Sequence, residues 1–201
     1  MPLSLEEQRR RWPRAWLCLF GLGATLGVAL DAIHAHLGAT VYTNPVWWRL
    51  AWWTPLLFGS AFTIGLIRPV VDSLFARRKS RRVPPPRRAE VGIAMGLFVA
   101  AYFTTVLPLS WPLVAALLVA NFGLGFWLCD RSLTGLGIAL CATLGGAAVE
   151  SFLIAHGRFF YLKPVYLGLA GWLPFLYLSA AVALTTLARW LIEPGEPGAA
   201  L

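Results

Sequence analysis

Two long apolar runs separated by a short polar turn decide the fold. The first run is PLVAALLVANFGLGFWLC, residues 112–129, and the second is LTGLGIALCATLGGAAVESFLIA, residues 133–155. Between them stand only Asp130, Arg131 and Ser132. An apolar α-helix of about 20 residues crosses a bilayer core of about 30 Å. The turn leaves no room for a soluble segment, so this stretch predicts two antiparallel membrane-spanning helices.

The rest of the chain has the same character. Of its 201 residues, 58% are hydrophobic and 13% are charged, whereas soluble domains carry about 25% charged residues. The fold class that this predicts is all-α, a polytopic membrane protein with six transmembrane helices in a single domain covering residues 1–201. The six expected spans are residues 16–37, 50–71, 91–107, 112–129, 133–155 and 167–187.

The basic residues predict the orientation of these spans. With the N-terminus inside, fourteen of the seventeen basic residues lie on the inner side and three on the outer side, which are Arg49, Arg158 and Lys163. By the positive-inside rule, both termini are expected in the cytosol, with cytosolic segments at residues 1–15, 76–90 and 193–201. Because the charges crowd between hydrophobic runs, we read them as orientation signals and expect no nucleic-acid partner.

Ionisable groups inside spans are candidates for chemistry, because burying them in a bilayer is costly. Asp31 and His34 lie on one face of the first span, and Glu150 lies at a similar depth in the fifth. They could form a proton relay, which would suit a small proton-coupled transporter or carrier, or a structural polar cluster near the head groups. Because metal-ligand spacing is absent, we expect no metal ion and no cofactor.

No nucleophile motif or phosphate-binding loop is present, so the sequence predicts a protein that is not an enzyme. Gly23 and Gly27 are four residues apart on the first span, a spacing that lets helices approach closely. This spacing is compatible with plain helix packing, and also with a cleft that admits a flat lipid.

Two motifs resemble those of the Insig (insulin-induced gene) family. The first is Ala51-Trp-Trp-Thr-Pro55, and the second is Trp127-Leu-Cys-Asp-Arg-Ser-Leu-Thr-Gly-Leu-Gly137. The resemblance runs from Ala51 to about Leu191, and it continues through Trp172-Leu-Pro174 and Arg189.

The resemblance implies a non-enzymatic regulator of sterol homeostasis, which binds an oxysterol within the helix bundle and associates with membrane-protein partners. The positions matching the family's lipid pocket are Phe98 and Phe126, with Trp127 beside them, and we expect Gly23 and Gly27 to face them across the cleft. Asp130 matches the partner-binding acid. Phe98 and Phe126 could instead be packing aromatics, and Asp130 could also cap the fifth span.

The sequence departs from the family pattern at several polar positions. Tyr102 and Phe103 replace an Asn-His pair, while Leu113 and Ser151 each replace a Gln. Lost amides weaken recognition of a sterol hydroxyl, so a glycerolipid with one polar head is a further candidate ligand. Arg-rich, Lys-poor composition points to a prokaryotic homologue. The expected location is then the plasma (inner) membrane, and for a eukaryotic protein the endoplasmic reticulum membrane. A homo-oligomer is compatible with either.

Overall fold

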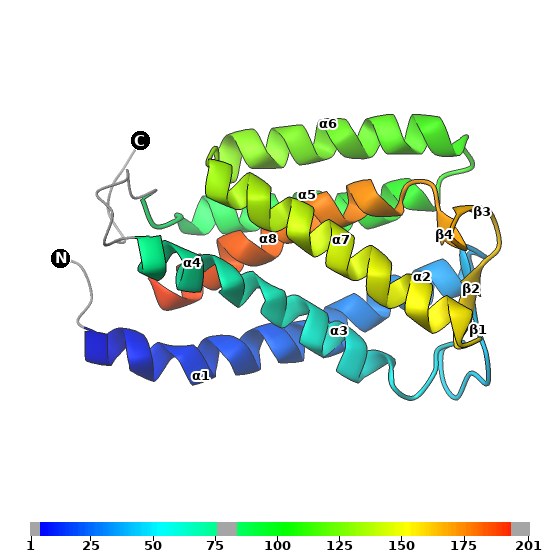
Figure 1. Cartoon of the computed structure of the whole chain (residues 1–201), viewed down its shortest axis with the longest axis horizontal. Helices are drawn as coiled ribbons and strands as arrows, with labels where there is room; N and C mark the ends of the chain where they lie inside the picture. The colour runs from blue at the N-terminus through cyan, green and yellow to red at the C-terminus, as the bar shows by residue number, and fades with distance from the viewer. Residues whose placement is uncertain (1–4, 76–83, 194–201) are drawn as a thin grey trace.

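The computed structural model describes residues 5–75 and 84–193 as one helical bundle with two small β-sheets at one end, one of which is a β-hairpin (Figure 1). We call that end the hairpin end. The opposite end holds the turn at residues 130–132, and we call it the basic end. Some residues that contribute to the predicted orientation lie outside the described residues, namely Arg77, Arg78, Lys79, Arg81 and Arg82. The side chain of Arg9 and residues 76–83 of the predicted loop 76–90 also lie outside the description.

The first span is a long helix with one widened turn. It consists of α1 (Leu5–Leu22), a π-helical turn η1 (Gly23–Gly27) and α2 (Val28–His36). Turns of this kind occur mostly as local bulges in α-helices. Here the turn coincides with two glycines that pack against the next span, so the first span fits around its neighbour at this point.

The second span breaks in its middle. α3 (Thr54–Thr63) and α4 (Ile67–Phe75) are joined by a 3-10 turn, η2 (Ile64–Leu66). Pro69 explains the break, because it has no N–H to donate to the carbonyl of Gly65 and its ring crowds that carbonyl. The break brings Gly65 against the backbone of Leu184, where a Cβ atom would overlap the Leu184 carbonyl.

Four further helices complete the bundle: α5 (Arg88–Thr105), α6 (Trp111–Cys129), α7 (Leu133–Ala155) and α8 (Leu173–Ile192). α8 is the central helix, since 67% of its apolar stretch is buried inside the bundle, compared with 11% of the apolar stretch of α7. It packs against α5, α6, α7, α1 and the second span. α7 crosses it on the side shown in Figure 1.

The hairpin end contains strands that the sequence analysis did not predict. β1 (Thr40–Tyr42) pairs antiparallel with β2 (Phe159–Tyr161), and β3 (Pro164–Tyr166) pairs antiparallel with β4 (Leu169–Ala170). The sixth helix therefore begins at Leu173 and not at Leu167, because residues 164–170 fold into a hairpin. Periodicity cannot separate such short apolar strands from the start of an apolar helix.

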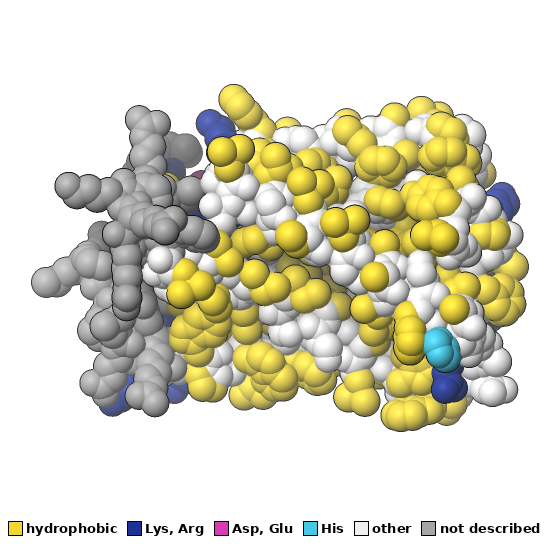
Figure 2. Space-filling view, in the orientation of Figure 1, with side chains coloured by type: hydrophobic (Ala, Val, Ile, Leu, Met, Phe, Trp, Pro, Cys, Tyr) yellow, Lys and Arg dark blue, Asp and Glu magenta, His cyan; other side chains and the backbone are white. Residues whose placement is uncertain are grey.

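Within the described ranges, five segments are long and apolar enough to cross a membrane. They correspond to the first, second, fourth, fifth and sixth predicted spans. α5, the third, belongs to the same bundle but begins with Arg88 and Glu90 and is not among the five. On the face seen in Figure 2, apolar side chains cover the middle of the molecule, and Lys and Arg side chains lie at its two ends.

Candidate functional site

A cavity of about 300 Å³ lies between α3, η2, α7 and α8, and α2 and α5 contribute to its floor. Most of its lining is apolar. Phe58, Phe62 and Ala61 line it from the second span, while Leu176 and Ala181 line it from α8. α3 and α7 make few direct contacts with each other. The face between them is hollowed in Figure 2. An apolar cavity on a bundle's lipid-facing side suits the apolar part of a small amphiphile.

Asp31 and His34 form part of the polar end of this cavity. Both side chains are buried and line it. Asp31 Oδ2 accepts a hydrogen bond of 2.6 Å from the hydroxyl of Tyr42. His34 Nε2 lies 2.7 Å from Thr105 Oγ1, and the His34 ring stacks on Tyr102 with centroids 4.9 Å apart.

Glu150 completes the polar end from α7. Its carboxylate accepts hydrogen bonds from the hydroxyls of Tyr161, at 2.6 Å, and of Tyr177. Burial, followed by the nearby carboxylates, raises the pKa of the Tyr42 and Tyr161 phenols well above the ordinary value. Both phenols therefore remain protonated donors at physiological pH. We call the following residues the polar cluster: Asp31, His34, Tyr42, Glu150, Tyr161 and Tyr177.

The structure thus brings together Asp31, His34 and Glu150, which the sequence analysis singled out. His36 points away from His34, is exposed, and bonds to the carbonyl of Ala32. Among the described residues, no three His, Cys, Asp or Glu side chains are grouped so that they could hold a metal ion. The tyrosine partners were missed, because Tyr42 and Tyr161 lie on the unpredicted strands β1 and β2, and Tyr177 lies on α8, whose rotation in the bundle the sequence does not give.

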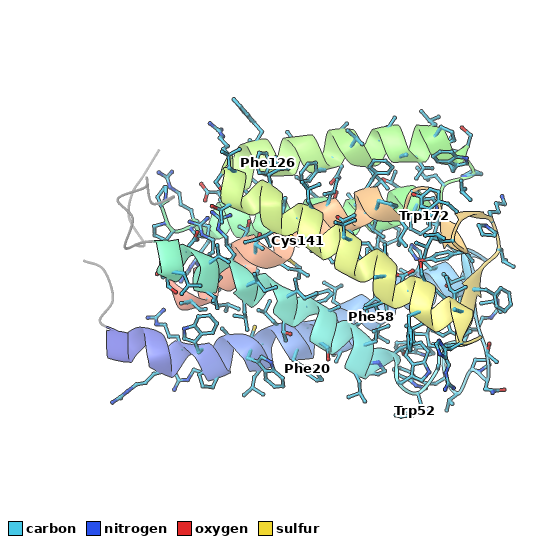
Figure 3. The ribbon with its side chains drawn as sticks, in the orientation of Figure 1. Phe20, Trp52, Phe58, Phe126, Cys141 and Trp172 are labelled. Carbon is cyan, nitrogen blue, oxygen red and sulfur yellow. The ribbon has the colours of Figure 1, made fainter. Side chains whose placement is uncertain are left out.

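The predicted pocket aromatics are separated. Phe98 is 2% exposed, lines the cavity, and meets Phe62 and Tyr102 edge-on. Phe126 does not line this cavity. It packs beside Phe122 on α6, and in Figure 3 it lies on the α6 side of the bundle, far from Phe58 on α3. Trp127 is 63% exposed on the outside of the bundle, with the Arg131 guanidinium 4.3 Å above its ring.

Gly23 and Gly27 also lie outside the cavity lining. A Cβ atom at Gly23 would overlap the backbone of Phe58, and one at Gly27 would come 3.0 Å from the ring of Phe62. The two glycines therefore allow close packing between the first and second spans. The cleft expected beside them is filled by the side chains of Phe58 and Phe62, which also line the cavity.

Asp130 occupies a different environment from the one expected. Instead of facing the cytosol, its side chain is 3% exposed and forms an ion pair with Arg68. It does not cap the fifth span either. Ser132 is the N-cap of α7 and accepts a hydrogen bond of 3.0 Å from the Gly135 N–H. The reason is that a fully buried guanidinium from the second span must be neutralised at this point.

Arg68 lies at the centre of a group of charged side chains, although from the sequence it was only one of the basic residues that predict orientation. Its Nε donates to both oxygens of Asp72, and its NH2 group donates to Ser132 Oγ at 2.9 Å. Arg189 of α8 lies 3.7 Å from Asp72 and donates to the Pro84 carbonyl. An arginine inside a predicted span was the signal that could have revealed the cluster. We call Arg68, Asp72, Asp130, Ser132 and Arg189 the ion-pair cluster.

Known proteins are similar to this chain in sequence and in fold. No family model matches it. It is 27% identical to human insulin-induced gene 1 protein over 204 residues, which covers 94% of this chain and 72% of that protein. It is 28% identical to the Xenopus tropicalis protein of that name, covering 92% and 75%. It is 29% identical to the Danio rerio protein, covering 89% and 72%.

Two solved structures show the same fold. The Insig homologue MvINS from Mycobacterium vanbaalenii superposes with a TM-score of 0.75 and 24% identity, covering 94% of this chain and 95% of that one. A cross-linked trimer of an MvINS variant gives a TM-score of 0.76, also with 24% identity, covering 96% and 97%. Sequence similarity along about nine-tenths of the chain, together with the shared fold, supports the Insig family for this chain, and its apolar helices support an integral, multi-pass membrane protein.

Proposed function

We propose that this protein is a non-enzymatic membrane regulator that holds a lipid in the cavity between α3, α7 and α8. The observation that carries the proposal is the cavity itself, which combines a mostly apolar lining with its two carboxyl side chains at the polar cluster. An amphiphile could enter between α3 and α7 with its tail toward the bilayer and its head toward the polar cluster. Sterol, oxysterol and glycerolipid all have this division into an apolar body and a small polar head.

Gly145 provides a sharp test, because it lines the cavity at an exposed position and a Cβ atom there meets no other atom within 4 Å. Gly145→Phe should close the entrance without disturbing the packing. Gly137→Phe is the matched control, since Gly137 lies on the same helix, is also unobstructed, and does not line the cavity. Native mass spectrometry of gently extracted protein should show a lipid on the wild type and the control, and much less on Gly145→Phe. Equal lipid on both variants would place the lipid elsewhere.

We further propose six spans with both termini in the cytosol, including α5 as the third. Support comes from the fourteen-to-three division of basic residues and from the position of α5 in the bundle, where it packs against α6 and α8. Association with a membrane-protein partner and assembly of several copies are part of the proposal. The trimer of MvINS supports the second.

The carrier alternative retains one supporting observation, which is that Asp31, His34 and Glu150 line one cavity. A carrier would need Asp31 for ion-coupled flux in proteoliposomes, whereas a regulator would not. If ion-coupled flux is present in the wild type and lost in Asp31→Asn, the carrier function is supported and the regulator function is rejected.

A further inference from the structure

We propose that the cavity selects an amphiphile whose head group is a protonated amine. This inference rests on the proposed function, because it names the chemistry of the ligand that the cavity holds. Two carboxyl side chains, Asp31 and Glu150, line the cavity, and no Lys or Arg is among its lining residues. A phosphate head would meet two acids and no compensating cation, so an anionic lipid is disfavoured.

One carboxylate in the cavity lining, Asp31, has an oxygen atom that accepts no hydrogen bond from the described residues. Asp31 is 5% exposed, and while its Oδ2 accepts from Tyr42, its Oδ1 accepts no hydrogen bond from the described residues. A carboxylate has about four acceptor sites. Glu150 already receives two tyrosine hydroxyls, one on each oxygen. Asp31 is therefore the buried acceptor that a ligand would complete.

His34 contributes a second acceptor by the same reasoning. Thr105 Oγ1 donates its proton to the Tyr102 carbonyl at 2.6 Å, so it must accept from the His34 Nε2–H. In the neutral ring, this assigns Nδ1 as the acceptor. The polar end thus offers Asp31 as an acceptor that lacks a second donor, with the His34 ring in the same lining. An ammonium group has three donors, no acceptor and a compensating charge, whereas an alcohol supplies one donor and no charge.

The experiment compares three amphiphiles with one tail: octadecylamine, octadecanol and octadecyl phosphate. Binding of each is measured by calorimetry to the full chain in nanodiscs of uncharged lipid, and binding to empty nanodiscs is subtracted. We expect the amine to bind at least about tenfold more tightly than the alcohol, since a charge-assisted hydrogen bond is roughly twice as strong as a neutral one. The phosphate should bind most weakly.

Two variants separate the head-group contacts from the cavity. Asp31→Asn keeps an acceptor for Tyr42 but removes the charge, and it should reduce the preference for amine over alcohol to about twofold. Glu90→Gln is the matched control. It removes a carboxylate that caps α5 outside the cavity, with a side chain that can still cap, and it should keep the full preference.

The outcomes are distinguishable. If the alcohol binds the wild type as tightly as the amine does, or if Asp31→Asn keeps the preference, the head-group assignment is overturned while the lipid cavity stands. If none of the three amphiphiles binds the wild type better than it binds Gly145→Phe, the cavity does not hold a lipid, and the proposed function fails with it.

Discussion

The side chain of Arg68 has no exposed surface, and two carboxylates and a hydroxyl surround its guanidinium group. At the scale of the residue, this makes Asp130 a structural acid. We expect Asp130→Asn to lower the free energy of unfolding by about 2–3 kcal/mol, somewhat less than the full cost of breaking a buried pair, because Asp72 still pairs with Arg68. Thermal unfolding of the purified protein measures this change, with Glu90→Gln as the control. A midpoint equal to that of the control would contradict the prediction.

The ion pair between Asp130 and Arg68 changes how a loss of partner binding in Asp130→Asn should be interpreted. We propose that the buried Asp130 influences a partner indirectly, through the shape of the 130–132 turn. Loss of partners in Asp130→Asn should therefore accompany loss of stability, and both should recover in a stabilised background. Pull-down of membrane partners with each variant provides the comparison. Lost partners with an unchanged unfolding midpoint would instead indicate a direct charge contact.

Gly135 gives an independent test of this turn. A Cβ atom there would overlap the Asp130 carboxylate and approach the Arg68 guanidinium, whereas one at Gly137 meets nothing. We expect Gly135→Ala to cost about 1–3 kcal/mol of stability through overpacking. Gly137→Ala should be neutral or slightly stabilising, because Ala is the better helix former. The difference between their unfolding midpoints is the readout, and equal midpoints would argue against the tight turn.

At the scale of the element, the close contact between the first and second spans depends on missing side chains. Gly23 packs on the backbone of Phe58, while Gly21 has nothing within 4 Å. Gly23→Ala should separate η1 from α3 and cost about 1–3 kcal/mol, and Gly21→Ala should not. Unfolding in mild detergent tests this pair. Similar stability of both variants would show that the two helices can separate at little cost.

The elements also show how far sequence reasoning reaches. The long apolar runs and the short turn at residues 130–132 predict helices within a few residues, because length and hydropathy are properties of the run itself. The pairing of β1 with β2 could not be predicted, since these three-residue strands are far apart in sequence. The start of α8 was missed because the short apolar strands β3 and β4 cannot be told from the start of an apolar helix by periodicity. The resemblance assigned Phe98 to a pocket with Phe126, whereas Phe98 lines the cavity without it. Phe58 and Tyr177 were missed because their roles depend on how helices pack.

At the scale of the whole molecule, the predicted orientation can be tested directly. Single cysteines at Ser80 and Ser110, in a background without native cysteines, should react with an impermeant reagent from opposite sides of a sealed vesicle. Ser80 lies outside the described residues, and Ser110 precedes α6 without making a side-chain cap. The positive-inside rule predicts Ser80 in the cytosol. Labelling of both positions from one side would contradict the six-span arrangement.

The central position of α8 has a consequence for biosynthesis. The ribosome makes this helix after the five helices that surround it, so those five enter the bilayer before the helix on which they pack exists. Until α8 is released, Arg68 and Asp72 also lack the nearby Arg189. Nascent chains arrested before Leu173 should therefore be membrane-integrated yet sensitive to protease, and quality-control factors that recognise unassembled helices would have a defined interval in which to act.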